Sequence, residues 1–394
     1  MHIAAFAAGA LAAMTLASAA AAEAPTGQSN WLQIEASYKG DVASVVSGGL
    51  ERGTHILGNG ELTLDADLAK FGWSGARVKL HLLSVHGANP NDLAGTAQGI
   101  NNIEADPDRT KLYQIWLEQS FAGDRASILV GMTDLNAEFY QNDAAGLLIA
   151  PAFGIGSELA STGPNGPSIF PSTAFAGRLR VTPSEGLYAQ VALFNAKAGV
   201  LGDVDGVDFK MRDGALAIAE AGITRNGKLA LGYWRYTKRQ PDIVRTDAQG
   251  DPLGRVAQGL YLIAERPLAG SEEAGRQLTG FTRLGVSDGD TSPFQGGWQA
   301  GVLLEGVFKG RPDTRLSFGV NQAYFSRKFR LAALGSGSAL KRAETGLEIT
   351  YQHPLGPYLS VQPDLQYVLN PAGSAGTKNA LIVGVRFTVA APLM

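Results

Sequence analysis

Polar side chains that recur at every second position are the residues of this sequence best suited to chemistry. Three segments carry such rows, which are Arg77, Lys79 and His81; Gln114, Trp116 and Glu118; and Arg178 and Arg180. Residues two apart on a β-strand point to the same face, so each set would form one polar row. Such rows offer hydrogen-bond donors, acceptors and an aromatic surface for weak contacts with a polar solute.

Residue types that serve catalysis or metal binding are scarce. The chain has 5 histidines and no cysteine, which excludes thiol catalysis and cysteine-ligated metals. His81 and His86 fall on opposite faces of one strand and make a poor metal pair. Glu104, Asp106 and Asp108 lack the glycine of a calcium loop, and no Gly-x-Ser-x-Gly elbow is present. We therefore expect no metal, no cofactor and no enzyme, with an outer-membrane hydrolase as the enzymatic alternative.

The elements that must position the polar rows are strands of a single sheet. We predict about sixteen strands, and their ranges are 33–47, 54–69, 73–87, 110–121, 124–132, 172–182, 186–195, 213–224, 227–239, 255–267, 275–286, 295–306, 314–326, 341–352, 357–368 and 379–390. Apolar and polar residues alternate in several of them: Leu365 and Tyr367 share one face, and Asp364 and Gln366 share the other. Periodicity alone does not distinguish a soluble sandwich from a membrane barrel.

The gaps between strands favour the barrel, because short and long gaps alternate. The gaps Lys70-Phe71-Gly72 and Ala122-Gly123-Asp124 are short, whereas the gaps from Ala88 to Arg109 and from Thr133 to about Ser172 are long. Outer-membrane barrels have short periplasmic turns, long outer loops and an even number of strands, and about sixteen strands leave an aqueous channel. Aromatic residues near strand ends fit interfacial girdles; they are Trp73, Phe121, Tyr236, Phe308, Tyr351 and Tyr358.

The longest gap predicts a constriction. Thr133 to Ser172 is too long for an ordinary connection, and we expect it to fold inward and narrow the channel, with a short helix over Ala144 to Ala150. A flap on the outer surface is the alternative.

The first residues predict export. Ala4 to Ala22 is apolar and alanine-rich, and it ends in small residues before Glu23. We expect residues 1–22 to be a signal peptide and residues 23–394 to be one barrel domain; a lone transmembrane anchor is the alternative. The formal net charge of -3 gives no signal for a nucleic-acid partner.

The ordered set of short motifs resembles the carbohydrate-selective porin (OprB-like) family over most of the mature chain. The pieces are Gly48-Gly49-Leu50, Trp73-Ser74-Gly75-Ala76, Asn102-Ile103-Glu104-Ala105, Trp116-Leu117-Glu118-Gln119, Gly131-Met132-Thr133-Asp134-Leu135-Asn136 and Pro363-Asp364-Leu365-Gln366-Tyr367-Val368-Leu369-Asn370-Pro371. The resemblance implies an outer-membrane barrel through which sugars diffuse into the periplasm. One departure is the terminus Ala391-Pro392-Leu393-Met394, since many such barrels end in an aromatic residue that the assembly machinery reads.

Together these patterns predict a passive channel that binds small carbohydrates weakly. We expect the binding residues to be Arg77, Glu104, Trp116, Glu118, Arg178 and Arg180; Glu104 is chosen from the family likeness and its place in a long loop. The expected partners are small carbohydrates, outer-membrane lipid, the barrel assembly machinery and, as in many porins, further copies of the chain. A general or anion-preferring porin has the same architecture, and an adhesive surface protein would conduct nothing.

Overall fold

The structure is a computed structural model, and it describes residues 31–271 and 273–393. The predicted signal peptide, residues 1–22, lies outside the described residues. Within them, sixteen antiparallel strands close into a barrel in which β1 pairs with β18, Val42 lying opposite Val385. This confirms the predicted all-β barrel. Among these same residues, no helix is both long and apolar enough to cross a membrane.

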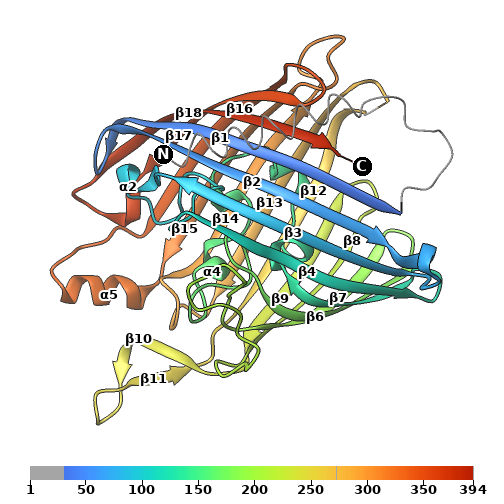
Figure 1. The fold of residues 1–394 in the computed structure, drawn as a ribbon. Helices are drawn as coiled ribbons and strands as arrows, with labels where there is room; N and C mark the ends of the chain where they lie inside the picture. Colours follow the sequence, from blue (N-terminus) through green and yellow to red (C-terminus); the bar gives the residue numbers. More distant parts are fainter. Residues whose placement is uncertain (1–30, 272, 394) are drawn as a thin grey trace.

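The barrel strands follow one another around the sheet (Figure 1). They are β1 (Leu32–Gly49), β2 (Gly53–Asp67), β3 (Ala76–Gly87), β4 (Arg109–Phe121), β5 (Ala126–Thr133), β6 (Ala174–Ser184), β7 (Leu187–Asn195), β8 (Ala215–Ile223), β9 (Lys228–Tyr236), β12 (Gln258–Ser271), β13 (Arg276–Ser287), β14 (Phe294–Glu305), β15 (Arg315–Phe325), β16 (Ala343–Pro354), β17 (Leu359–Leu369) and β18 (Lys378–Pro392).

The remaining elements lie in the connections. They are the hairpin β10 (Gln240–Thr246) and β11 (Pro252–Arg255), the α-helices α2 (Asn91–Ala94), α3 (Leu135–Glu138), α4 (Ser157–Ala160) and α5 (Arg327–Gly335), and the 3-10 turns η1 (Leu68–Phe71), η2 (Asp143–Ala145), η3 (Pro151–Phe153) and η4 (Pro371–Gly373). Figure 1 shows α2, α5 and the hairpin at one end of the barrel, whereas β18 finishes at the other end. The short turns and the long loops therefore occupy opposite ends, as the gap lengths predict.

Burial along the strands is inverted relative to a soluble protein. On β17, Leu365 and Tyr367 are 44% and 40% exposed, whereas Asp364 and Gln366 are 6% and 3% exposed. An apolar face that stays exposed all around a closed barrel fits lipid, and a polar face turned inward fits a lumen. The alternation of apolar and polar residues therefore marks a lipid-facing side and a lumen-facing side of each strand.

The aromatic girdle is confirmed at the end with the short turns, with one exception. Of the predicted rings, Trp73, Phe121, Phe308 and Tyr358 are exposed beside these turns, as is Phe71, which was not predicted; Tyr351 is half-buried and packs edge-on against Phe308. Tyr236 was expected in the girdle but is 1% exposed and hydrogen bonds to Thr162 of the β5–β6 loop. That expectation is wrong, because Tyr236 is on the inward face of β9 and a loop fills the lumen there.

Three local features differ from the sequence expectations. The β10–β11 hairpin and α5 were not predicted; both lie in gaps between barrel strands to which the sequence assigned no element. The helix expected over Ala144 to Ala150 is only the turn η2, since Gly146 follows it at once and a glycine weakens a short helix.

Candidate solute-binding channel

The β5–β6 loop, residues 134–173, folds into the lumen and supplies the core of one half of the barrel. Leu135, Phe139 and Leu159 of the loop are fully buried, and they pack in one cluster with Phe194 and Trp234 of the wall. Burying side chains of this size stabilises the folded position by roughly 1.5–3 kcal/mol each. The inward fold, and not the surface flap, is therefore the observed arrangement.

Carboxylates of the wall, most of them buried, hold the loop backbone in place. Glu348 of β16 accepts hydrogen bonds from the N–H groups of Ile149 and Ala150. Glu265 of β12 accepts from the Ala144 N–H at 2.8 Å. Two further carboxylates also accept hydrogen bonds from loop N–H groups. Glu220 accepts from the N–H of Tyr140, and Glu344 accepts from the N–H groups of Ala97 and Gln98 in the β3–β4 loop. These acids fasten the two inward loops rather than facing solute.

Arg283 of β13 is the cationic counterpart of these acids. Its guanidinium donates to the carbonyls of Tyr140 at 2.9 Å and Gly154 at 2.6 Å, and also to those of Phe153 and Ala152. Its side chain is 1% exposed. Arginine carries five donors in a fixed fork, which lets one residue bind several carbonyls of a turn.

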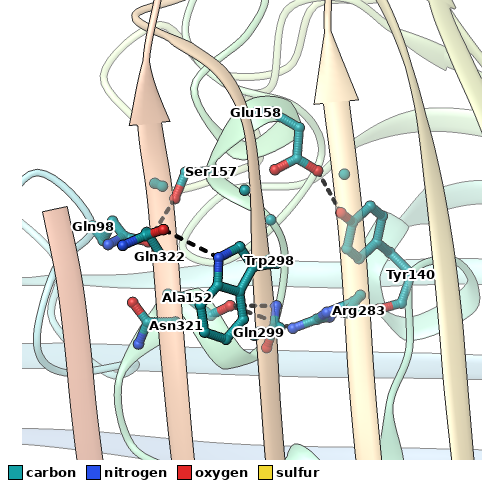
Figure 2. A pocket seen from close by; sticks show the side chains of 14 residues that line it. Gln98, Tyr140, Ala152, Ser157, Glu158, Arg283, Trp298, Gln299, Asn321 and Gln322 are labelled. Atoms are coloured by element: carbon teal, nitrogen blue, oxygen red, sulfur yellow. Dashed lines mark hydrogen bonds between the residues drawn. The ribbon is translucent and has the colours of Figure 1, made fainter. Parts of the chain in front are cut away.

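Figure 2 shows this seam between the loop and strands β13 to β15, where Arg283 reaches toward Ala152 and Tyr140 faces Glu158. The approach is so close that a Cβ on Gly285 would stand 1.8 Å from the Glu158 carboxylate. Only glycine fits there. The seam encloses a volume of about 10 Å³, too small to be a solute path.

Two of the predicted binding residues, Glu118 and Arg178, meet in a buried ion network. Arg178 is 4% exposed and lies 2.8 Å from Glu118 and 3.0 Å from Glu138 of α3. It also donates to the Ser127 hydroxyl at 2.6 Å. Because every arm of the guanidinium is engaged, this pair joins the wall to the loop and shapes the channel.

The remaining predicted residues of the wall are more open. Arg77 is exposed and lies 3.9 Å from Asp65. Arg180 stacks over the Tyr188 ring at 4.9 Å and, with Glu118 and Arg178, lines a cavity of about 330 Å³. Trp116 alternates with Ile115, which is 41% exposed on the outer face, so its indole is on the inward face. Its register partner is Gly131, where a Cβ would stand 2.7 Å from the Trp116 Cβ.

Glu104 lies where the prediction placed it, in a loop that reaches the lumen. It lines a cavity of about 440 Å³ together with Lys39, Glu61 and His81 of the wall. The pKa of Glu104 is raised to about 7, chiefly by burial; the hydrogen bond from the Asn91 N–H lowers it and the charge of Asp92 raises it. The Glu61 carboxylate beside it is paired with the Lys39 ammonium group at 3.1 Å and lies 3.3 Å from the His81 ring.

A second cavity of about 330 Å³ lies under the turn η2 and is lined almost wholly by the β5–β6 loop. It shares Asn102, Asn136 and Gly154 with the larger cavity. The residues common to the two cavities are therefore two carboxamides and a glycine. None of these three residues was among the predicted binding residues, although Asn102 and Asn136 stand in the motifs that carry the family resemblance.

The comparisons with known proteins agree with this geometry. Residues 51–390 match the family described as "Carbohydrate-selective porin, OprB family". Porin B of Pseudomonas aeruginosa is 24% identical, and the match covers 96% of this chain and 95% of that protein. Porin AaxA of Chlamydia pneumoniae is 22% identical over 78% of this chain and 64% of that protein.

Solved structures support the same fold. The high-pH structure of Pseudomonas putida OprB superposes with a TM-score of 0.82 at 21% identity, covering 91% of this chain and 94% of that chain. The low-pH structure of the same protein gives a TM-score of 0.58 at 17% identity. The chain belongs to the carbohydrate-selective porin, OprB family, and it is a porin of the bacterial outer membrane and not an enzyme.

Proposed function

We propose that this porin is a passive channel through which small carbohydrates diffuse into the periplasm and in which they bind weakly. One observation carries the proposal: the charged side chains that hold the loops inward are paired or hydrogen bonded, and both cavities are lined by the neutral residues Asn102, Asn136 and Gly154. A sugar carries no net charge, so it gains from neutral hydrogen-bonding groups that replace its water. Contacts of this kind are weak enough to permit release.

The six residues expected from the sequence divide into two proposed roles. Trp116, Arg180, Arg77 and Glu104 offer a ring face, cations and a carboxyl group to the lumen, and they make transient contacts with the sugar. Glu118 and Arg178 act through the ion network with Glu138, and they set the position of α3.

The proposed partners follow from the outer surface. The exposed apolar residues of the strands suit acyl chains of the outer membrane; examples are Val191, Leu193, Leu229 and Leu231. The barrel assembly machinery would insert the chain, and further copies would associate through part of the same band. Residues 1–22 would act as the signal peptide of a barrel domain over 23–394.

Liposome swelling tests the proposal directly. Vesicles that contain the purified porin are diluted into iso-osmotic glucose, a disaccharide or a neutral solute of similar size that lacks hydroxyl groups. We expect glucose to enter faster than the solute without hydroxyls. Reversal potentials in a planar bilayer separate the anion-preferring alternative: strong anion selectivity together with no slowing of current by sugar would overturn the carbohydrate proposal.

A further inference from the structure

Asn102 and Asn136, the two carboxamides that line both cavities, are held on fixed backbones. Asn102 belongs to the β3–β4 loop, and its N–H donates to the Ile149 carbonyl of the β5–β6 loop at 2.9 Å. Asn136 lies in the first turn of α3, and its N–H donates to the capping carboxylate of Asp134 at 2.7 Å. Each loop thus presents one asparagine to both cavities from an anchored position.

The neighbours of each amide decide which of its atoms is left for solute. The Asn102 Oδ1 accepts from the Arg386 guanidinium at 2.8 Å, and a guanidinium has donors only. The oxygen must therefore face Arg386, which leaves the Nδ2 donors of Asn102 free. The Asn136 Nδ2 donates to the Phe139 carbonyl at 3.2 Å, which only accepts, so the Oδ1 of Asn136 is left as an acceptor.

Each cavity contains a further asparagine with unsatisfied polar atoms. In the larger cavity, Asn59 is 1% exposed and its Oδ1 has no hydrogen-bond partner. In the smaller cavity, Asn142 is 8% exposed and neither its Oδ1 nor its Nδ2 has a partner. Buried amides without partners are rare because they are costly, so these atoms indicate groups that a hydrogen-bonding solute would satisfy.

We propose that Asn102 and Asn136 form a hydroxyl clasp, a donor–acceptor pair that reads sugar hydroxyls at the passage between the cavities, with Asn59 and Asn142 as the next contacts on either side. The inference rests on the proposed function and names its specificity-determining residues. A hydroxyl both donates and accepts, so it satisfies both amides. An ether oxygen or an anion only accepts, and it leaves the Asn136 Oδ1 unpaired.

The test compares two probes on three variants, using block of ion current through the full-length porin in planar bilayers. Glucose donates and accepts, whereas permethylated glucose only accepts. Asn102→Leu removes the donor and Asn136→Leu removes the acceptor, at nearly constant side-chain size. Asn89→Leu is the matched control, because Asn89 lies in the same loop as Asn102 and lines neither cavity.

We expect glucose block to weaken about fivefold in each of the two clasp variants, the effect of losing one neutral hydrogen bond. Block by permethylated glucose should weaken in Asn102→Leu only. In Asn89→Leu both probes should behave as in the wild type. If both probes respond equally to both clasp substitutions, or if neither probe responds, the clasp is refuted.

A further variant, Gly154→Ala, keeps both asparagines, so it tests the clasp without the risk that replacing an asparagine misfolds the loop. A Cβ at Gly154 would stand 3.4 Å from the Asn136 Oδ1, so Gly154→Ala should shield the acceptor and reproduce the effect of Asn136→Leu on glucose. Wild-type glucose block in a folded Gly154→Ala protein would count against the clasp. Failure of the wild type to pass glucose in liposome swelling would instead overturn the proposed function itself, independently of the variants.

Discussion

Replacing Arg283 with methionine should release part of the constriction without opening the barrel. The guanidinium makes three short contacts to loop carbonyls, those of Tyr140, Phe153 and Gly154, and a longer one of 3.3 Å to Ala152. A hydrogen bond with a charged partner contributes about 1.5–3 kcal/mol, but lumen water can replace part of it. We therefore expect the docked position of residues 151–155 to lose about 2–4 kcal/mol.

That loss corresponds to a shift of about 30- to 1,000-fold in the equilibrium between docked and undocked turns. Other anchors persist, since Glu348 still holds Ile149 and Ala150 and Gln299 still donates to Ala152. Single-channel recordings should show a larger and noisier open conductance together with weaker block by glucose. The strand ladder is untouched, so the barrel should keep its heat-modifiable mobility in gels.

The control is Arg276→Met, because Arg276 is exposed at the start of the same strand. It should conduct and be blocked like the wild type. If a folded Arg283→Met channel had the conductance, noise and sugar block of the wild type, the reasoning that this guanidinium holds the constriction would be refuted.

Three further outcomes are expected. Trp116→Ala should weaken sugar block more than it changes open conductance in planar bilayers, and equal changes would show that the indole is only part of the wall. The pKa of Glu104, raised by burial to about 7, means that its carboxyl group is neutral below this pH and charged above it. Cation selectivity should therefore rise as pH increases through about 7, measured by reversal potential, and Glu104→Gln should abolish the rise; an unchanged profile in that variant would assign the titration elsewhere. Leu231→Arg places a charge on the lipid face, where Leu231 is 58% exposed, at a cost of about 2–4 kcal/mol near the bilayer centre; it should lower the yield of folding into lipid vesicles, while Leu231→Ala should not, and equal yields would contradict the lipid-facing assignment.

The sequence determined the sixteen barrel strands because their signal is local. Alternation with period two, strand length and the order of short and long gaps are each read within one stretch of chain, and the closed barrel follows from them. The same alternation placed Trp116 on an inward face, whereas Glu104 was expected to reach the channel from the family resemblance and its place in a long loop.

Only the tertiary structure decided what the inward polar groups do. Arg178 and Glu118 resemble solute contacts in the sequence, yet Glu138, 40 residues from Arg178, turns them into a buried ion network. Glu348 binds the backbone of Ile149, 199 residues away. Periodicity shows which side of a strand a side chain takes, but it holds no information about which loop will meet it there. Asn102 and Asn136 owe their free donor and acceptor to Arg386 and Phe139, and only the folded chain brings these partners together.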